Sequence, residues 1–181
     1  HMLGFIYMGR TDYPKAVDYY RQALLARPEF YICQNNLGTA LMASGRWEEA
    51  VEVYEELINK PTYNTPELAY NNLGWSYFQL GQIERANESL QMAVFLKPQL
   101  CLAHQNLGLV QKHQKNEHGA LRYFLKAIKH CPNYVDPHFE VAQILMARRD
   151  PKAKEYFQRC YELASETLVG DRCRSYLEVY P

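Results

Sequence analysis

A Leu-Gly pair recurs along the chain at an almost constant interval. From Leu3-Gly4 to Leu37-Gly38 the spacing is 34 residues, and an alanine follows each pair 13 positions later. A repeat period of this size is typical of a solenoid, in which small helical units stack and each unit buries its apolar face against the next. Such a chain offers an extended surface rather than one enclosed cleft. The remaining pairs are Leu73-Gly74 and Leu107-Gly108, and the alanines are Ala16, Ala50, Ala86 and Ala120.

The sizes of the repeated residues indicate how the two helices of each unit pack together. When Leu-Gly is numbered 7 and 8 in each unit, the alanine falls at position 20 and a bulky residue at position 24. Small residues at 8 and 20 allow two antiparallel helices to approach closely, and the bulky residue fills the space beside them. Gly45 and Gly81 are expected to end first helices in the left-handed conformation. Second helices are expected to stop before Pro28, Pro98 and Pro132.

The pattern resembles the tetratricopeptide repeat, in which each unit is a helix-turn-helix hairpin. The resemblance implies an all-α fold: a right-handed superhelical solenoid of such hairpins, closed by a C-terminal capping helix. In the fifth unit, Val141-Ala142 replaces Leu-Gly. We predict a single domain over residues 1–181. Its units are expected at about 1–30 (truncated), 31–66, 67–100, 101–134 and 135–165, with the capping helix at 166–180.

The two ends and the overall charge limit the function classes. Residue 3 falls in the middle of a repeat, so we expect the natural chain to begin upstream, with any signal peptide or lipid anchor there. The chain has 20 Lys and Arg residues and 20 Asp and Glu residues, so its formal charges balance. It therefore lacks the excess of positive charge that is typical of proteins that bind nucleic acid. The sequence has no apolar run of 18 residues, so we expect no transmembrane helix within it.

In solenoids of this type, positions 2, 5, 9 and 12 of the first helices line a concave groove. Here most of these positions are large and apolar, and a monomer rarely leaves such a patch exposed without a use. Methionine and aromatic side chains suit an adaptable surface for an apolar helix or extended segment of a protein partner. For Leu68 and Leu102, the alternative to exposure in the groove is that they pack against the next unit. The predicted groove residues are Phe5, Met8, Asn35, Met42, Leu68, Asn71, Trp75, Phe78, Leu102, Gln105, Leu109, Phe139 and Met146.

An asparagine precedes Leu-Gly in three units, at Asn36, Asn72 and Asn106. These side chains carry donors and an acceptor, so they could pair with the main chain of a bound segment, as in related repeat arrays. They could equally bond within their own hairpins. Position 5 carries Asn or Gln and no converging lysines, which disfavours the carboxylate-binding co-chaperone type of array.

No catalytic or metal-binding pattern is present. His104 is expected on a core-facing position and His113, His118, His130 and His138 near turns or helix ends, without a second ligand at i+4. There is no phosphate-binding loop and no nucleophile elbow. We therefore predict a non-enzymatic protein without a metal or cofactor.

The interval from Leu37 to Leu73 is 36 residues, and the two extra residues fall in a proline-bounded loop at 59–67. Tyr63, Pro66 and Glu67, followed by Asn72-Leu73-Gly74, resemble the type IV pilus secretin pilotin lipoproteins, the Tgl/PilF group. This resemblance implies a lipoprotein on the periplasmic face of the outer membrane. It would bind secretin subunits and promote their insertion and multimerisation in pilus biogenesis. The alternatives are a generic, cytoplasmic scaffold or co-chaperone for soluble partners, and the substrate-binding array of a larger enzyme.

A periplasmic location would permit disulfides among the five cysteines. Cys160 falls on the last second helix, and Cys173 falls on the terminal helix expected to pack beside it. A Cys160–Cys173 bridge is therefore a possible disulfide, and buried reduced cysteines are the alternative.

Overall fold

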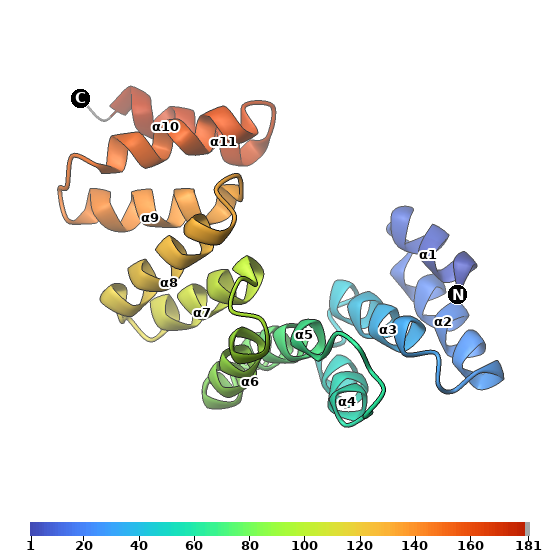
Figure 1. Cartoon of the computed structure of the whole chain (residues 1–181). Helices are drawn as coiled ribbons and strands as arrows, with labels where there is room; N and C mark the ends of the chain where they lie inside the picture. The colour runs from blue at the N-terminus through green and yellow to red at the C-terminus, as the bar shows by residue number, and fades with distance from the viewer. Residues whose placement is uncertain (180–181) are drawn as a thin grey trace. The chain divides into compact units, whose positions relative to one another are not determined.

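The computed structural model describes residues 1–179, and its regular elements there are all α-helices (Figure 1). Consecutive helices form antiparallel hairpins, which confirms the predicted all-α repeat fold. The chain divides into two compact units, His1–Pro98 and Gln99–Pro181, and each is described by itself. Among the described residues, no helix combines the length and hydrophobicity that crossing a bilayer requires.

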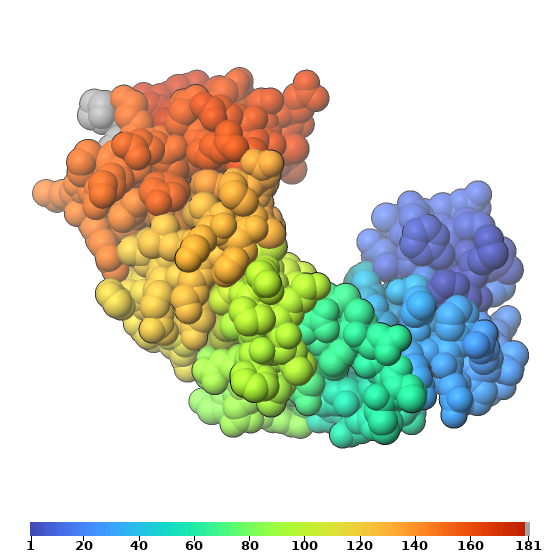
Figure 2. Space-filling model, in the orientation of Figure 1, coloured from blue at the N-terminus to red at the C-terminus, as the bar shows by residue number. Residues whose placement is uncertain are grey.

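The first unit contains three hairpins that pack in chain order, as the space-filling view shows (Figure 2). Each second helix also packs against the first helix of the next hairpin. The helices are α1 (Met2–Gly9), α2 (Tyr13–Ala26), α3 (Tyr31–Ala43), α4 (Trp47–Ile58), α5 (Pro66–Gln79) and α6 (Ile83–Leu96).

The second unit contains two hairpins and a terminal helix, which packs on α10. The terminal helix corresponds to the predicted capping helix at 166–180, of which Tyr180 lies outside the described residues. The helices are α7 (Cys101–His113), α8 (Glu117–His130), α9 (Val135–Ala147), α10 (Ala153–Ala164) and α11 (Leu168–Val179).

The position-8 glycines touch the bulky residues at position 24 within each hairpin. A Cβ atom added to Gly38 would lie 2.5 Å from Cζ of Tyr54, and one added to Gly108 would lie 2.3 Å from Cε1 of Phe124. Both rings and the position-20 alanines are fully buried. The predicted packing of small against large residues is therefore confirmed, and no larger side chain fits at Gly38 or Gly108 without movement of the facing ring.

The turns inside the hairpins share one backbone conformation. Gly45 and Gly81 have φ angles of +72° and +73°, as predicted, and Thr11, Lys115 and Arg149 adopt the same left-handed conformation at the equivalent position. Second helices end two residues before Pro28, Pro98 and Pro132, because proline cannot continue a helix.

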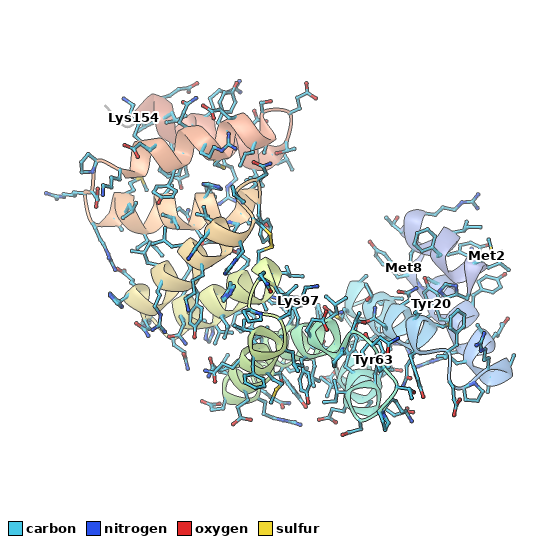
Figure 3. The ribbon with its side chains drawn as sticks, viewed as in Figure 1. Met2, Met8, Tyr20, Tyr63, Lys97 and Lys154 are labelled. Atoms are coloured by element: carbon cyan, nitrogen blue, oxygen red, sulfur yellow. A yellow bond between two sulfur atoms is a disulfide. The ribbon has the colours of Figure 1, made fainter. Side chains whose placement is uncertain are left out.

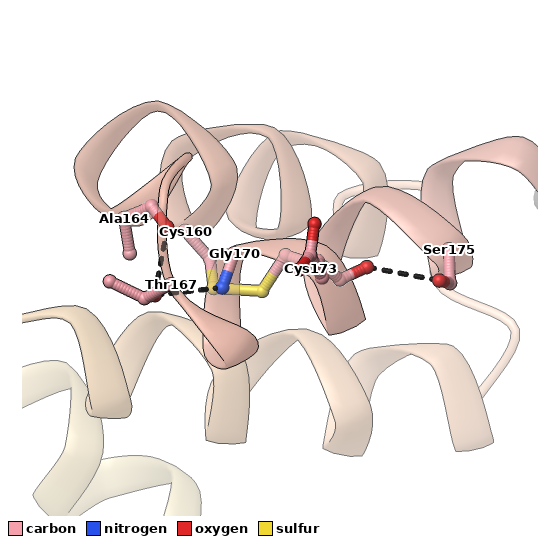
Figure 4. Close-up of a disulfide and its surroundings, with 7 residues drawn as sticks. Cys160, Ala164, Thr167, Gly170, Cys173 and Ser175 are labelled. Atoms are coloured by element: carbon pink, nitrogen blue, oxygen red, sulfur yellow. Dashed lines mark hydrogen bonds between the residues drawn. A yellow bond between two sulfur atoms is a disulfide. The ribbon is translucent and has the colours of Figure 1, made fainter.

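The Cys160–Cys173 disulfide holds α11 against α10 (Figure 4), which confirms the predicted pair; the two Cα atoms are 6.1 Å apart. Between the helices, the Thr167 hydroxyl donates to the Ala164 carbonyl at 2.8 Å and accepts from the Gly170 N–H at 3.2 Å. A Cβ atom on Gly170 would meet the Ala164 carbonyl oxygen at 1.9 Å. Only glycine permits this approach.

A second disulfide, Cys101–Cys131, was not predicted. It joins the first residue of α7 to the residue after α8, with the Cα atoms 6.0 Å apart. The two cysteines stand at positions 1 and 31 of the same unit, where the ends of an antiparallel hairpin lie side by side. Cys33 is a buried free thiol, and burial raises its pKa.

Replacing both Cys160 and Cys173 by alanine (C160A/C173A) should lower the free energy of unfolding of the second unit by about 2–4 kcal/mol, because a crosslink restricts the unfolded chain. Chemical denaturation followed by circular dichroism measures this change. As a control on pairing, the unreduced wild-type protein should show one reactive thiol, Cys33, after unfolding. Three or five thiols would contradict the assignment.

Candidate binding surface

The first helices of the first unit carry large apolar side chains at position 12, and α1 and α5 also at position 9, where α3 has Thr39. Positions 9 and 12 share one side of each helix because they are three residues apart. Phe5 is 67% exposed, and the other members are half-buried. The rings of Trp75 and Phe78 contact each other, with centroids 5.3 Å apart. We call this set the first-helix face; Met8 marks it on α1 in Figure 3. Its residues are Phe5, Met8, Met42, Trp75 and Phe78.

Four predicted groove residues are buried instead: Asn71, Gln105, Asn106 and Phe139. Their predicted placement at the surface is wrong. Phe139, which is 6% exposed, is the clearest case. Its ring centroid lies 6.1 Å from that of Phe157 and 6.0 Å from that of Tyr176 on α11, and Arg172 lies over the ring at 4.5 Å.

The remaining groove residues of the second unit are only partly accessible. Leu109 and Met146 are half-buried and pack against the second unit's core, whereas Leu102 is exposed on α7. In the first unit, Leu68 is half-buried on α5. The first unit therefore holds most of the predicted residues that remain at the surface, and their binding role stays a prediction.

Asn72 is engaged in a hydrogen-bond network that joins two hairpins. Its Nδ2 donates to the Tyr54 hydroxyl at 3.0 Å, and its Oδ1 accepts from Nδ2 of Asn71 at 3.1 Å. The Tyr54 hydroxyl also contacts the Thr39 hydroxyl at 3.1 Å and the Asn35 carbonyl at 3.3 Å. Because burial raises the pKa of Tyr54, the phenol stays neutral. Asn72 therefore forms hydrogen bonds within the protein, as one of the two interpretations expected. Its partner Tyr54 lies in the preceding hairpin, however, and not in its own.

The other predicted asparagines differ from Asn72. Nδ2 of Asn36 lies 3.1 Å from Nε2 of His1, at the start of the chain. Asn35 accepts a hydrogen bond at Oδ1 from the Tyr63 hydroxyl, at 3.4 Å. Asn35 and Asn36 are both half-buried, so they remain accessible to a partner in part.

The loop at 59–67 is attached to the preceding hairpin. Tyr63, labelled in Figure 3, has its ring edge toward that of Tyr31, with centroids 6.3 Å apart. The Thr62 hydroxyl donates to that of Tyr31 at 3.2 Å. Together with Phe30 and the exposed Ile32, these residues line a cavity of about 350 Å³ beside Asn35. Sequence reasoning marked Tyr63 by its place in the irregular loop but did not find this cavity.

The histidines named in the sequence serve packing where they are buried. The His104 ring stacks on that of His130, with centroids 5.5 Å apart, and Nε2 of His138 lies 2.8 Å from the Pro132 carbonyl oxygen. Burial lowers the pKa of His138, so this ring is neutral at pH 7. Within residues 1–179, no three His, Cys, Asp or Glu side chains cluster in a way that could hold a metal ion.

Two models of the tetratricopeptide repeat match the chain, over residues 1–64 and 68–100. Among curated proteins, the peroxisomal targeting signal receptor of Eremothecium gossypii is 36% identical over 93 residues, which is 51% of this chain and 16% of the receptor. The chain thus matches only a small part of that relative.

Solved structures share the fold. PilW, described as a widely conserved type IV pilus biogenesis factor, has a TM-score of 0.80 at 24% identity over 93% of this chain and 78% of its own. PilF of Pseudomonas aeruginosa has the same TM-score and identity, over 98% and 82%. A thermophilic repeat protein of Thermus thermophilus, TTC0263, has a TM-score of 0.81 at 19% identity, over 98% and 96%. At these identities the likeness establishes the fold alone.

The network around Tyr54 predicts a structural role for Asn72. Asn72→Ala removes a donor to a buried phenol and the acceptor of one hydrogen bond from Asn71, so it should lower the free energy of unfolding of the first unit by about 1–3 kcal/mol. Urea denaturation followed by tryptophan fluorescence measures this, because both tryptophans, Trp47 and Trp75, lie in the first unit. The matched control is Asn36→Ala at the same repeat position, which should cost less than about 0.5 kcal/mol. Equal losses of unfolding free energy in the Asn72→Ala and Asn36→Ala variants would contradict a structural role for the network.

Proposed function

The chain belongs to the tetratricopeptide repeat family, and we propose that it is a pilotin for a type IV pilus secretin. The repeat array is a scaffold for protein interactions. In the proposed role it catalyses no reaction, binds secretin subunits, and promotes their outer-membrane insertion and multimerisation.

The first-helix face carries this proposal. Three successive first helices present methionine and aromatic side chains at the surface, and such residues form adaptable contacts with apolar partners. Trp75 and Phe78 provide a paired aromatic anchor at one end of the face, and Phe5 an exposed ring at the other. A secretin subunit has apolar segments that need shielding before insertion into the membrane. The face supplies a surface of matching chemistry.

The irregular loop supports the choice of subfamily. Tyr63 is fixed by its contacts with Tyr31 and Asn35, so the two-residue insertion is an ordered part of the first unit. The same loop carries Pro66 and Glu67 of the pilotin-like sequence pattern. The fold shared with PilW, a pilus biogenesis factor, is consistent with this assignment.

The two disulfides support the proposed compartment. Structural disulfides persist in oxidising environments such as the periplasm and are rare in the cytosol. The Cys101–Cys131 and Cys160–Cys173 bridges therefore favour an oxidising compartment such as the periplasm, where the proposed lipoprotein would lie. They weigh against the alternative of a cytoplasmic scaffold or co-chaperone for soluble partners.

Charge placed on the aromatic anchor tests the proposal. The double variant W75E/F78E should fold, as judged by circular dichroism and gel filtration, and should lose at least tenfold in affinity for purified secretin subunits, because buried charge opposes an apolar contact. In cells that lack the wild-type protein, it should fail to restore detergent-resistant secretin multimers.

The control is Phe95→Glu, which places one negative charge on an exposed aromatic residue of a second helix. This variant should bind and restore multimers as the wild type does. A folded W75E/F78E protein that still binds secretin and restores multimers would refute the proposed role of the face.

A further inference from the structure

The second helix α8 carries three exposed cations along one side, Arg122, Lys126 and Lys129. They stand at repeat positions 22, 26 and 29, which face the same way because they are three and four residues apart. The helix has one acid, Glu117, at its first residue. We call the three cations the basic stripe.

The repeats allow a comparison at the same three positions. Among the second helices that the structure describes, only α8 has cations at all of them. In α2 and α4 the positions hold acidic, amide or apolar side chains: Asp18, Gln22, Leu25, Glu52, Glu56 and Asn59. The equivalent positions of α6 and α10 include the acids Glu88 and Glu155. The packing of a hairpin therefore does not require positive charge there.

The basic stripe also lacks carboxylate partners within the chain. On α6, Arg85 pairs with Glu55 at 2.6 Å, whereas no member of the stripe forms a salt bridge with a residue in the described range 1–179. Like charges four residues apart destabilise a helix. The helix dipole favours Lys129 in the last turn but not Arg122 near the middle. The fold itself thus gives no reason for this concentration of charge, which points to an anion from outside the chain.

The side chains beside the stripe organise it. The ring of the half-buried Tyr123 has Cζ of Arg122 at 5.1 Å from its centroid and Nζ of Lys126 at 5.8 Å. Contacts of a cation with an aromatic face hold the two charged groups near one another at the surface. Leu125, 38% exposed, adjoins the stripe on the side away from Tyr123. A partner of the stripe therefore meets one apolar contact as well as the charges.

The surroundings of the stripe favour a narrow protein segment over other anions. A flat anionic membrane would extend to the neighbouring second helices, and α10 of the same unit has the acids Glu155 and Glu162 at the equivalent positions. A single-stranded nucleic acid gains from stacking its bases on exposed rings. Here the face of the Tyr123 ring is occupied by the two cations. A segment that lies along α8 alone avoids both conflicts.

We propose that the basic stripe docks an acidic helical segment of a protein partner. Glutamates at i, i+4 and i+7 of such a helix repeat the spacing of the three cations, so three charge pairs form together. An apolar residue beside the glutamates would contact Leu125. This site lies in the second unit, outside the first-helix face, and does not depend on the pilotin assignment.

Fluorescence anisotropy with the whole protein tests the site. The probe is a labelled, alanine-based helical peptide with glutamates at i, i+4 and i+7 and a leucine beside them. It should bind in about 50 mM salt and about tenfold more weakly in about 500 mM salt, because salt screens exposed charges. A matched peptide with glutamine in place of glutamate should bind about tenfold more weakly at low salt, since it forms no charge pairs.

Variants locate the effect on α8. R122Q/K126Q/K129Q should fold, because α2 has a glutamine at one of these positions, and should bind the acidic peptide about tenfold more weakly. Arg122→Gln alone should weaken binding about threefold, and it keeps the test valid if the triple variant does not fold. The matched control, R149Q/K152Q/K154Q, removes three exposed cations of the same unit at the start of α10 and should bind as the wild type does.

The proposal is overturned if the folded triple variant of α8 binds the peptide as tightly as the wild type. It is also overturned if the control variant loses as much affinity, because net charge alone would then explain the binding. Binding of phosphatidylglycerol vesicles or oligothymidylate by the stripe, without binding of the peptide, would reject a protein partner. A dimer at low salt that the triple variant abolishes would assign the stripe to a second copy of the chain and would also overturn the proposal.

Discussion

The close contact between a glycine and a large side chain inside the first four hairpins is the constraint on which the rest of the structure depends. Because Gly38 has no Cβ, the Tyr54 ring lies directly against the facing helix and is fully buried. That position brings the Tyr54 hydroxyl within reach of Asn72 on the next hairpin. One steric requirement thus sets both the closure of a hairpin and its hydrogen bond to its neighbour.

The same packing decides which side chains reach the surface. With positions 7, 8 and 11 committed to the hairpin core, positions 9 and 12 of the first unit are left to form the first-helix face. In the second unit, α11 adds a further layer, held by the Cys160–Cys173 bridge, and Tyr176 covers Phe139. The accessible apolar surface is therefore concentrated in the first unit, where the proposed partner would bind.

The repeat period was sufficient to predict the helices, their turns and the contacts inside each hairpin, because these depend on residues at fixed spacing. The Cys160–Cys173 pair was also predictable from helix order. Burial of Phe139 and Asn71 was not, because spacing identifies the side of a helix but not whether another element covers it. Cys101–Cys131 was missed although hairpin geometry brings positions 1 and 31 together.

The central claim is that contact between the position-8 glycine and the position-24 side chain holds the first four hairpins closed, and a double-mutant cycle at Gly38 and Tyr54 tests it most directly. Gly38→Ala should lower the free energy of unfolding of the first unit by about 1–3 kcal/mol, because the added methyl overlaps the ring. In a Tyr54→Ala background the same change should cost little, which gives a clear coupling energy. Urea unfolding followed by tryptophan fluorescence measures all four proteins. Additive losses, or a Gly38→Ala variant as stable as wild type, would contradict the claim.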